Sequence, residues 1–430
     1  MLKKNTKNKE KNERLENRLD LHLSMTVREI FEEIDCEMAR PKNMNYFDNF
    51  FKNFATKEKN IINNPNKKKI IGYFCMSVPE ELIYAADAIP VRLCAGSADS
   101  AEIGESYFPE VSCPMVKSAV GFASTSVLGI YQQCDLVIIP ATCDWKIKLA
   151  EILKEFIPVA ILDIPRVKNC ENSKQFWFNE IVKLKKIIEK NTKKKITKKR
   201  LLNAINLIHH AQYEFKRLQK IRKSNIHTIS GRDAGAVINA YFYDNAESWT
   251  QAMKNLNDEL EQRIKEKVSI VPNSSPRVLL TGSPFVFPNW KIPNLIESSG
   301  GALVCDEICT SNRYLNDMVA IDEKSMVDLI NAVADRYLQP CSCPVFSNND
   351  DRKNKLLNMI NEYNIEGVIY HVFKGCHPYD TELRSIEKML ADRGISQLKI
   401  ETDYNPEDKE QLRTRIEAFL ETLKGRRYSK

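Results

Sequence analysis

Short continuous runs of apolar residues, each followed by a polar or proline-containing loop, recur in two parts of this chain. Runs of this kind are typical of strands that are buried on both faces in a parallel sheet. In the first part they predict strands over residues 70–74, 91–94, 136–139 and 159–161. In the second part they predict strands over residues 277–282, 302–304, 368–371 and 398–401.

Helical patterns alternate with these strands. Pro79 and Pro114 each stand where a helix begins, because proline has a fixed φ and lacks an N–H that the first turn would leave unpaired. Further helices are predicted around residues 295–299 and over 324–336, 351–363 and 380–393. The alternation of strands and helices in both parts predicts an α/β fold with two doubly wound parallel sheets.

Two other segments lack the strand pattern. Residues 166–265 are helical and largely polar, and residues 20–54 turn helical with Ile30 and Met38 on one face. Residues 1–20 are almost all Lys, Asn, Glu and Arg, so we expect them to bury too little apolar surface to become ordered. The chain is therefore predicted to divide into a polar tail with an N-terminal helical segment, a first α/β domain, a helical basic insert and a second α/β domain, over residues 1–66, 67–165, 166–272 and 273–430.

The composition is that of a soluble globular protein, with 43% hydrophobic and 28% charged residues among 430. No apolar stretch approaches the roughly 20 residues of a membrane span, and the N-terminus has no apolar region typical of a signal peptide. We therefore expect a cytoplasmic protein without membrane attachment. Thiols stay reduced in the cytoplasm, so the 12 cysteines point to metal binding or catalysis rather than disulfides.

The net charge of +7 is concentrated in residues 181–223, whose apolar residues recur at helical spacing. The simplest interpretation is a pair of solvated helices. The alternatives are a docking surface for an acidic protein partner or an anionic coenzyme. Nucleic acid is a weaker candidate, because the basic residues lie in this one segment and the rest of the chain is slightly acidic.

Several cysteines follow the predicted strands, where parallel sheets bind their ligands. Thiolates gathered there from distant parts of a chain are typical of metal ligands, and sulfur favours an iron–sulfur cluster or zinc. Cys113 precedes Pro114 and is expected to cap a helix, where the free N–H groups and the helix dipole favour a thiolate. Cys341 and Cys343 lie in an irregular Cys-Ser-Cys segment, in which one ligand is expected, preferably Cys341. The candidate ligands, three from each half, are Cys75, Cys113, Cys143, Cys309, Cys341 and Cys376.

The other cysteines are expected to be ordinary residues, because a free cysteine usually behaves as a small hydrophobe. This interpretation applies to Cys36, Cys134, Cys170 and Cys305, and Cys94 stays open. Structural zinc sites usually draw on close Cys-x2-Cys pairs, and this chain has none. Six dispersed thiolates also exceed what one zinc needs, so an iron–sulfur cluster fits better.

Other catalytic motifs are absent from the sequence. It has no Gly-x-x-x-x-Gly-Lys-Ser/Thr phosphate loop, no Gly-x-Ser-x-Gly elbow and no His-Glu-x-x-His, so the chain is not expected to hydrolyse ATP itself. His377 could donate a hydrogen bond to a cluster sulfur or a proton to substrate, unless it is a solvated loop histidine. Glu80 could transfer a proton, or it could be a first-turn helix acid that suits the dipole.

These cysteines in their local contexts resemble the 2-hydroxyacyl-CoA dehydratase / benzoyl-CoA reductase superfamily, and in particular its double-cubane cluster branch. The resemblance covers about residues 65–425 and joins order, spacing and flanking residues. Its motifs include Gly-Tyr-Phe-Cys, Cys-Pro-Met-Val-Lys-Ser, Thr-Cys-Asp, Leu-Thr-Gly-Ser-Pro, Cys-Thr, Cys-Ser-Cys and Gly-Cys-His, at residues 72–75, 113–118, 142–144, 280–284, 309–310, 341–343 and 375–377.

The resemblance implies two flavodoxin-like domains and a separate ATP-hydrolysing iron–sulfur activase that supplies electrons at very low potential. In the dehydratases, each of two different subunits holds a [4Fe-4S] cluster on three cysteines, which Cys75, Cys113 and Cys376 match. In the double-cubane branch, a homodimer's subunit holds an [8Fe-9S] cluster on six cysteines. The additional thiolates that favour this branch are Cys143, Cys309 and Cys341.

We therefore predict an oxygen-sensitive iron–sulfur reductase component, typical of an anaerobe, which acts on a small substrate as a homodimer. The alternative enzyme is a lyase, namely a subunit of an (R)-2-hydroxyacyl-CoA dehydratase, in which an electron makes a ketyl radical of an acyl-CoA substrate. His377 stands where dehydratases more often have Asp, which disfavours a CoA thioester. Outside enzymes, the chain could be an electron carrier, a cluster scaffold or a zinc-stabilised binding protein.

Overall fold

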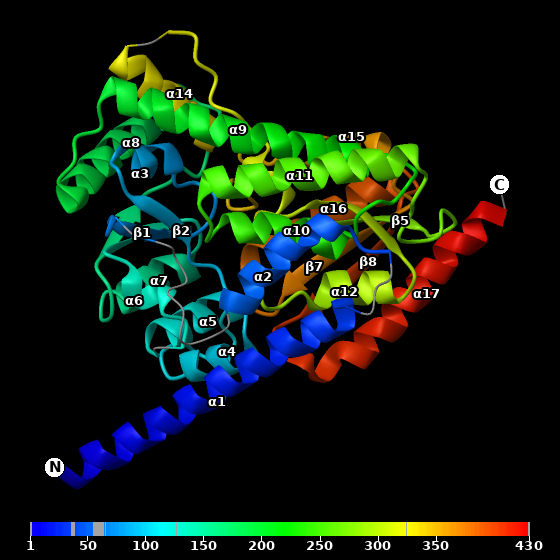
Figure 1. Ribbon diagram of the computed structural model, residues 1–430, viewed down its shortest axis with the longest axis horizontal. Helices are drawn as coiled ribbons and strands as arrows, with labels where there is room; N and C mark the ends of the chain where they lie inside the picture. The colour runs from blue at the N-terminus through cyan, green and yellow to red at the C-terminus, as the bar shows by residue number, and fades with distance from the viewer. Residues whose placement is uncertain are drawn as a thin grey trace.

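The computed structural model describes residues 2–35, 39–54, 64, 66–125, 127–323 and 325–428 (Figure 1). It contains two four-stranded parallel sheets, in which the strand orders are β2-β1-β3-β4 and β6-β5-β7-β8. The first sheet comprises β1 (Ile70–Tyr73), β2 (Ile89–Arg92), β3 (Leu136–Pro140) and β4 (Val159–Leu162). The second comprises β5 (Arg277–Gly282), β6 (Ala302–Glu307), β7 (Gly367–Phe373) and β8 (Ser396–Thr402). The predicted α/β class and the predicted strands are confirmed.

The burial of the strands explains why the sequence revealed them. Every residue of β1, β3, β5, β6 and β7 is buried, as continuous apolar runs require. The order of the strands reverses between β1 and β3 in the first sheet and between β5 and β7 in the second. In doubly wound folds, ligands bind beyond the carboxyl ends of the strands at such a reversal.

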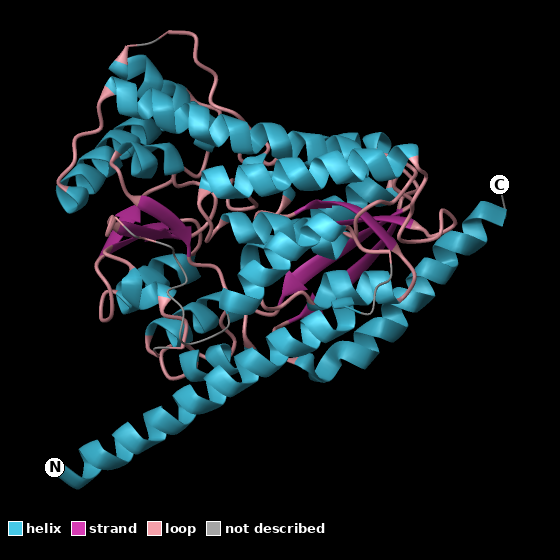
Figure 2. Ribbon diagram, viewed as in Figure 1, coloured by secondary structure: helices cyan, strands magenta, loops and turns pink. Residues whose placement is uncertain are grey.

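Helices cover both sheets (Figure 2). Those of the first half are α3 (Glu80–Ala85), α4 (Ala98–Gly104), α5 (Pro114–Ala123), α6 (Ile130–Gln133) and α7 (Asp144–Leu153). Those of the second half are α12 (Lys291–Ser298), α13 (Asn312–Leu315), α14 (Met326–Leu338), α15 (Asp350–Glu362), α16 (His377–Ala391) and α17 (Lys409–Tyr428). The predicted helices are present, with ends displaced by a few residues. Short 3-10 turns lie at Lys42–Met44 and Pro406–Asp408.

The segment between the sheets is helical, as predicted, and residues 166–265 contain no strand. It comprises α8 (Glu171–Thr192), α9 (Lys198–Arg222), α10 (Gly231–Tyr241) and α11 (Ala246–Lys265). Figure 1 shows α9 running across both halves of the molecule. Its apolar face is buried, including Leu201, Ile205 and Phe215. The insert therefore joins the two sheets.

The N-terminal helix differs from the expectation of a disordered tail, because α1 (Leu2–Asp35) begins well before residue 20. Leu19, Leu23 and Val27 are buried at helical spacing, and Arg18 forms ion pairs with α4. Lys and Glu are good helix formers, so a helix anchored by its apolar face can extend through the charged segment. The helix α2 (Asn45–Phe54) follows. Cys36 and Met38 lie outside the described residues.

One hydrophobic cluster spans α1, the insert and both sheets, and includes the buried side chains of Trp177, Trp249 and Trp290. A second cluster packs around β7 and α16. Among the described residues, no helix is both long and apolar enough to cross a membrane. The division of the chain into domains at residues 66, 165 and 272 stays a prediction.

Candidate metal centre

Cys75 follows the end of β1 in an unusual backbone conformation. Its φ is +60°, in the left-handed region that non-glycine residues seldom occupy. Its Sγ lies 3.6 Å from Oγ1 of Thr142, which belongs to the loop after the neighbouring strand β3. Strained residues of this kind cluster at functional sites, where the surrounding structure holds them in place. The turn therefore directs the Cys75 thiol toward the β3 loop.

Three further candidate ligands cap helices. Cys113, Cys143 and Cys376 are the N-cap residues of α5, α7 and α16. Proline occupies the first or second position of α5 and α16, which explains why the helices begin directly after these cysteines. The free N–H groups and the dipole at a helix N-terminus stabilise a thiolate. The predicted cap at Cys113 is confirmed.

A glycine brings the last of these helices against the first half of the molecule. Gly375 has φ +74°, and a Cβ on it would lie 2.1 Å from the carbonyl oxygen of Val111 and 3.2 Å from the backbone nitrogen of Cys113. The indole Nε1 of Trp145 on α7 donates a 3.0 Å hydrogen bond to the carbonyl of Gly375. The loop that carries Cys376 is therefore held beside Cys113 and α7.

Cys113 and Cys376 share a hydrogen bond. This bond lowers the pKa of Cys113 to about 7 against the opposing effect of burial, with help from the backbone N–H groups of Met115 and Val116. The pKa of Cys376, which donates the hydrogen bond, is raised well above its usual value. Cys143 interacts electrostatically with both thiols, and burial raises its pKa. Cys113, Cys143 and Cys376 thus form one group.

Cys75, Cys309 and Cys343 form a second group. Burial raises the pKa of Cys75 to about 11, and its thiol interacts electrostatically with that of Cys309. Cys343 also interacts with Cys75, and burial raises the pKa of Cys343 well above its usual value. The guanidinium of Arg92 donates to the carbonyl oxygen of Cys309 at 2.7 Å and lies 3.8 Å from its Sγ. This group draws on both halves of the molecule.

Burial separates the two cysteines of the Cys-Ser-Cys segment. Cys341 is only 3% exposed and belongs to the hydrophobic core, whereas Cys343 is half-buried. Lys168 donates to the carbonyl of Cys341 at 2.8 Å, and Arg313 donates to that of Ser342 at 2.7 Å. Among the described cysteines, those that are half-buried are Cys75, Cys113, Cys143, Cys309, Cys343 and Cys376.

Buried cations surround these thiols. Arg92, Lys146 and Arg313 are each no more than 5% exposed. Lys146 interacts electrostatically with Cys75, Cys113 and Cys143, and Arg313 with Cys309 and Cys343. Buried cations are costly unless an anion compensates them. The sequence interpretation missed all three, although a lysine on the apolar face of α7, three residues after Cys143, was a usable signal.

The donor set fits an iron–sulfur cluster. Within the described ranges, no three His, Cys, Asp or Glu side chains gather closely enough to hold one metal ion. A cluster places its thiolates on separate irons, so its ligands stand further apart than those of a single ion. Two groups of half-buried thiols beside buried cations satisfy that requirement.

Glu80 does not face open solvent. It is buried, and its carboxylate accepts hydrogen bonds from the hydroxyls of Tyr73, Tyr241 and Tyr314, the last two at 3.0 and 2.6 Å. Burial raises the pKa of Glu80, and the tyrosine hydroxyls oppose that shift. The adjacent Glu81 accepts a 2.8 Å bond from Tyr337. Glu80 is therefore the centre of a tyrosine cluster rather than a simple first-turn acid.

His377 is exposed at the first position of α16. Its ring stacks on Trp145 at a centroid distance of 6.3 Å. The His377 side chain is thus exposed beside Trp145, which lies two residues after Cys143.

The remaining cysteines differ in burial. Cys134 and Cys305 are buried in the core, as expected for small hydrophobes. Cys170 is exposed at the start of α8. Cys94 is buried, and its thiol interacts electrostatically with Cys75 and Arg92, so its role stays open.

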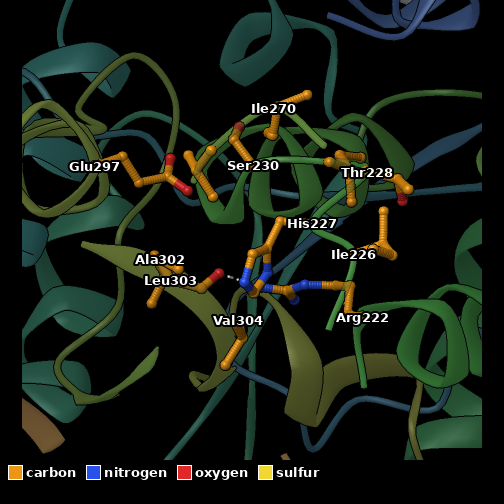
Figure 3. Close-up of a pocket in the computed structure, with 12 residues that line it drawn as sticks. Arg222, Ile226, His227, Thr228, Ser230, Ile270, Glu297, Ala302, Leu303 and Val304 are labelled. Carbon is orange, nitrogen blue, oxygen red and sulfur yellow. Dashed lines mark hydrogen bonds between the residues drawn. The ribbon is translucent and has the colours of Figure 1, made fainter. Parts of the chain in front are cut away.

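A separate small cavity lies elsewhere (Figure 3). It has a volume of about 20 Å³, and Arg222, His227 and Glu297 lie in its wall. It reaches Ala302 and Leu303 at the amino end of β6, whereas Cys309 follows the carboxyl end of that strand. Its size is about that of one water molecule. The cavity is therefore no part of the cysteine site.

Comparison with known proteins relates the sequence of this chain to dehydratase and reductase components. A family model described as 2-hydroxyglutaryl-CoA dehydratase, D-component, matches residues 75–423. The chain is 32% identical over 357 residues to the putative dehydratase subunit YjiM of Escherichia coli, covering 82% of this chain and 91% of the relative.

More distant relatives have related names. The chain is 25% identical over 398 residues to the (R)-phenyllactyl-CoA dehydratase beta subunit of Clostridium sporogenes, covering 88% of this chain and 100% of the relative. It is 22% identical over 366 residues to one of the benzoyl-CoA reductase subunits of Thauera aromatica, covering 83% of this chain and 91% of the relative.

Proposed function

This chain belongs to the 2-hydroxyglutaryl-CoA dehydratase, D-component, family, and on that premise we propose that it is the iron–sulfur component of a two-component, ATP-dependent reductase. A separate ATP-hydrolysing iron–sulfur activase would supply the electrons, and a small molecule would be the acceptor. The family resemblance seen in the sequence is confirmed. The names of the relatives support a role as a component of a dehydratase or reductase enzyme.

The observation that carries the proposal is the set of six half-buried cysteines at the carboxyl ends of the two sheets. When bound, an iron–sulfur cluster supplies one-electron chemistry at low potential. The chain's own contribution is to hold that cluster by thiolates and to limit its contact with water. Arg92, Lys146 and Arg313 supply the compensating positive charge.

The grouping of the thiols favours two joined cubanes. Cys113, Cys143 and Cys376 interact with one another, and Cys75 interacts with Cys309 and Cys343. Three thiolates for each half of an [8Fe-9S] double cubane would use both groups. The sequence preferred Cys341 as the sixth ligand, but its burial in the core favours Cys343.

Proton transfer would involve different residues. We propose that His377 delivers protons to substrate, because it is exposed and directly follows Cys376. Glu80 is enclosed by tyrosine hydroxyls, so we propose that it positions the turn after β1 rather than touching substrate.

The second candidate is a subunit of an (R)-2-hydroxyacyl-CoA dehydratase that holds a [4Fe-4S] cluster on Cys75, Cys113 and Cys376. The names of several relatives as dehydratase beta subunits favour it. A dehydratase requires a different sister subunit, whereas the double-cubane proposal requires a homodimer. A non-catalytic carrier or scaffold would need no substrate-accessible residue beside the thiols. His377 is exposed and directly follows Cys376, which favours a catalytic component over a carrier.

The proposal is tested by mixing the anaerobically purified chain with an iron–sulfur activase, a strong reductant and ATP, and recording absorbance and EPR spectra. We expect cluster reduction that requires ATP hydrolysis. The variant C376S should lose it, whereas C170S, which changes an exposed helix cap, should retain it. Absence of ATP-dependent reduction in a chain that holds iron would overturn the proposal. Dehydration of an acyl-CoA by the chain with a sister subunit would favour the second candidate.

A further inference from the structure

The buried lysine on α7 has no polar partner. Lys146 is 5% exposed, and its Nζ makes no hydrogen bond in the part of the chain that the structure describes. Its nearest compensation is the face of the Phe74 ring, with the ammonium 4.2 Å from the ring centroid. A cation–π contact replaces only part of the hydration that a buried ammonium loses. Three N–H donors thus stay available.

The position of this ammonium connects the two groups of thiols. It interacts electrostatically with Cys113 and Cys143 of the first group and with Cys75 of the second. Lys146 lies one turn into α7, whose N-cap is Cys143, and Phe74 directly precedes Cys75. The side chain is therefore fixed at both ends by segments that carry candidate ligands.

The two buried arginines are already engaged. Arg92 donates to the carbonyl of Cys309 and stacks on two aromatic rings. Arg313 donates to the carbonyl of Ser342 and pairs with the carboxylate of Glu307 at 3.3 Å. Lys146 differs from both, because its hydrogen-bonding capacity is unused.

We propose that Lys146 is a positioning residue that donates hydrogen bonds to a sulfur at the junction of the two thiol groups and so raises the reduction potential of the bound cluster. This inference rests on the proposed function, since it requires a cluster at these cysteines. Hydrogen bonds to cluster sulfurs and nearby positive charge stabilise the reduced, more negative state. Lys146 would thus allow the cluster to be reduced at a less negative potential than without this lysine.

The test compares K146M, K146R and the matched control K148M. Lys148 lies on the same helix but is exposed and paired with Glu151 at 2.9 Å. Iron content and midpoint potential are measured for each holoprotein by redox titration. In K146M we expect about tenfold less reduced cluster at a fixed applied potential, which for one electron is a shift of about 59 mV to more negative values. K146R should restore most of the shift, and K148M should match the wild type.

A second measurement needs no cluster. Removing an unpaired buried charge relieves its desolvation cost, so metal-free K146M should melt at a higher temperature than the wild type, and K148M should not. An unchanged midpoint potential in iron-loaded K146M, or a K146M apoprotein that melts lower than the wild type, would overturn the inference. A folded K146M without iron, with loading restored in K146R, would support it. A wild-type chain that binds no iron would instead overturn the proposed function, while the melting comparison would still report on Lys146 alone.

Discussion

Individual side chains at the candidate centre are held by contacts that reach across the molecule. Arg92 from the first sheet donates to the loop of Cys309 from the second, and Trp145 donates to Gly375. Because each contact joins residues far apart in sequence, the thiol groups depend on the complete fold. Substitution of a candidate ligand cysteine by serine, which changes one atom, should therefore affect iron binding more than it affects the free energy of unfolding.

The choice of the sixth ligand is a prediction at this scale. C343S should lose iron relative to the wild type, because the half-buried Cys343 interacts with Cys75. C341S should keep its iron and lose only some stability, because Cys341 is packed in the core. Iron determination on both anaerobically purified variants checks this. The reverse pattern would assign the ligand to Cys341, as the sequence suggested.

The tyrosine cluster around Glu80 makes a second prediction. E80Q should lower the free energy of unfolding by about 2 kcal/mol, because charge-assisted hydrogen bonds are weakened and a buried donor is introduced. The control is E247Q, which changes an exposed first-turn acid of α11 and should cost only a few tenths of a kcal/mol. Urea unfolding of the metal-free proteins provides the measurement. Equal effects of the two substitutions would contradict a special role for Glu80.

His227, beside the small cavity in Figure 3, predicts a pH dependence. Burial and the charge of Arg277 lower its pKa to about 4. The unfolded chain binds this proton near pH 6.5 and the folded chain does not, so stability is full above about pH 6.5 and falls as the pH drops toward 4. In H227Q, the decrease in the free energy of unfolding between pH 7 and pH 4 should be smaller than in the wild type by on the order of 2 kcal/mol, allowing for the partial exposure of the group.

Unfolding measured between pH 7 and pH 4 checks the prediction for His227. The control H210Q changes an exposed histidine of α9 and should leave the profile as in the wild type. Parallel profiles for H227Q and the wild type would show that His227 does not contribute.

At the scale of elements, the connection from β7 to α16 positions a ligand through the absence of a side chain. Gly375 and Gly394 both have positive φ, so alanine strains the backbone at each, by about 1 kcal/mol. A Cβ at Gly375 meets the carbonyl of Val111 at 2.1 Å, whereas a Cβ at Gly394 has nothing within 4 Å. Alanine strains the backbone at both positions, but only at Gly375 would it also displace the neighbouring segment. Comparing the two variants therefore distinguishes the effect of backbone strain from that of displacement.

We predict that G375A folds but loses iron, because the loop of Cys376 must move away from Cys113. G394A should lose similar stability and keep its iron. Iron content and thermal unfolding of both variants provide the measurements. Full iron in G375A would show that the close approach is not needed.

The sequence predicts an element well where neighbouring residues in the chain determine it, and poorly where contacts with distant segments do. The apolar runs of β1 and β3 are local, so they were found with nearly correct ends. The helix cap at Cys113 was predicted for the same reason, since Pro114 directly follows it, whereas the cap at Cys376 was not predicted. The early start of α1 was missed, because its order depends on packing and ion pairs with distant helices.

Several features of the candidate site have no local cause. The close approach of Gly375 to Val111 and the hydrogen bond from Tyr314 to Glu80 arise from contacts between distant segments, and the pattern of residues around Cys75 does not indicate its positive φ. Lys146 has an ordinary sequence context apart from its apolar helix face. The sequence therefore indicated candidate cysteines, which stay a prediction as ligands, but it did not predict the cations and backbone geometry around them.

At the scale of the whole molecule, the two sheets have the same strand order, and the proposed centre would draw its thiols from both halves. The insert and α1 share a hydrophobic core with both sheets, so the halves cannot separate without exposing apolar surface. The proposed centre would require this rigidity, because ligands from both halves would have to keep their spacing when the charge of a bound cluster changed.

The most direct test of this account is the iron and acid-labile sulfide content per chain of anaerobically purified or reconstituted protein. We predict about eight irons per chain, as a double cubane requires. About four irons would return the chain to the dehydratase alternative with a single cubane. No bound iron after anaerobic reconstitution of the folded chain would contradict the central claim that these cysteines hold a cluster.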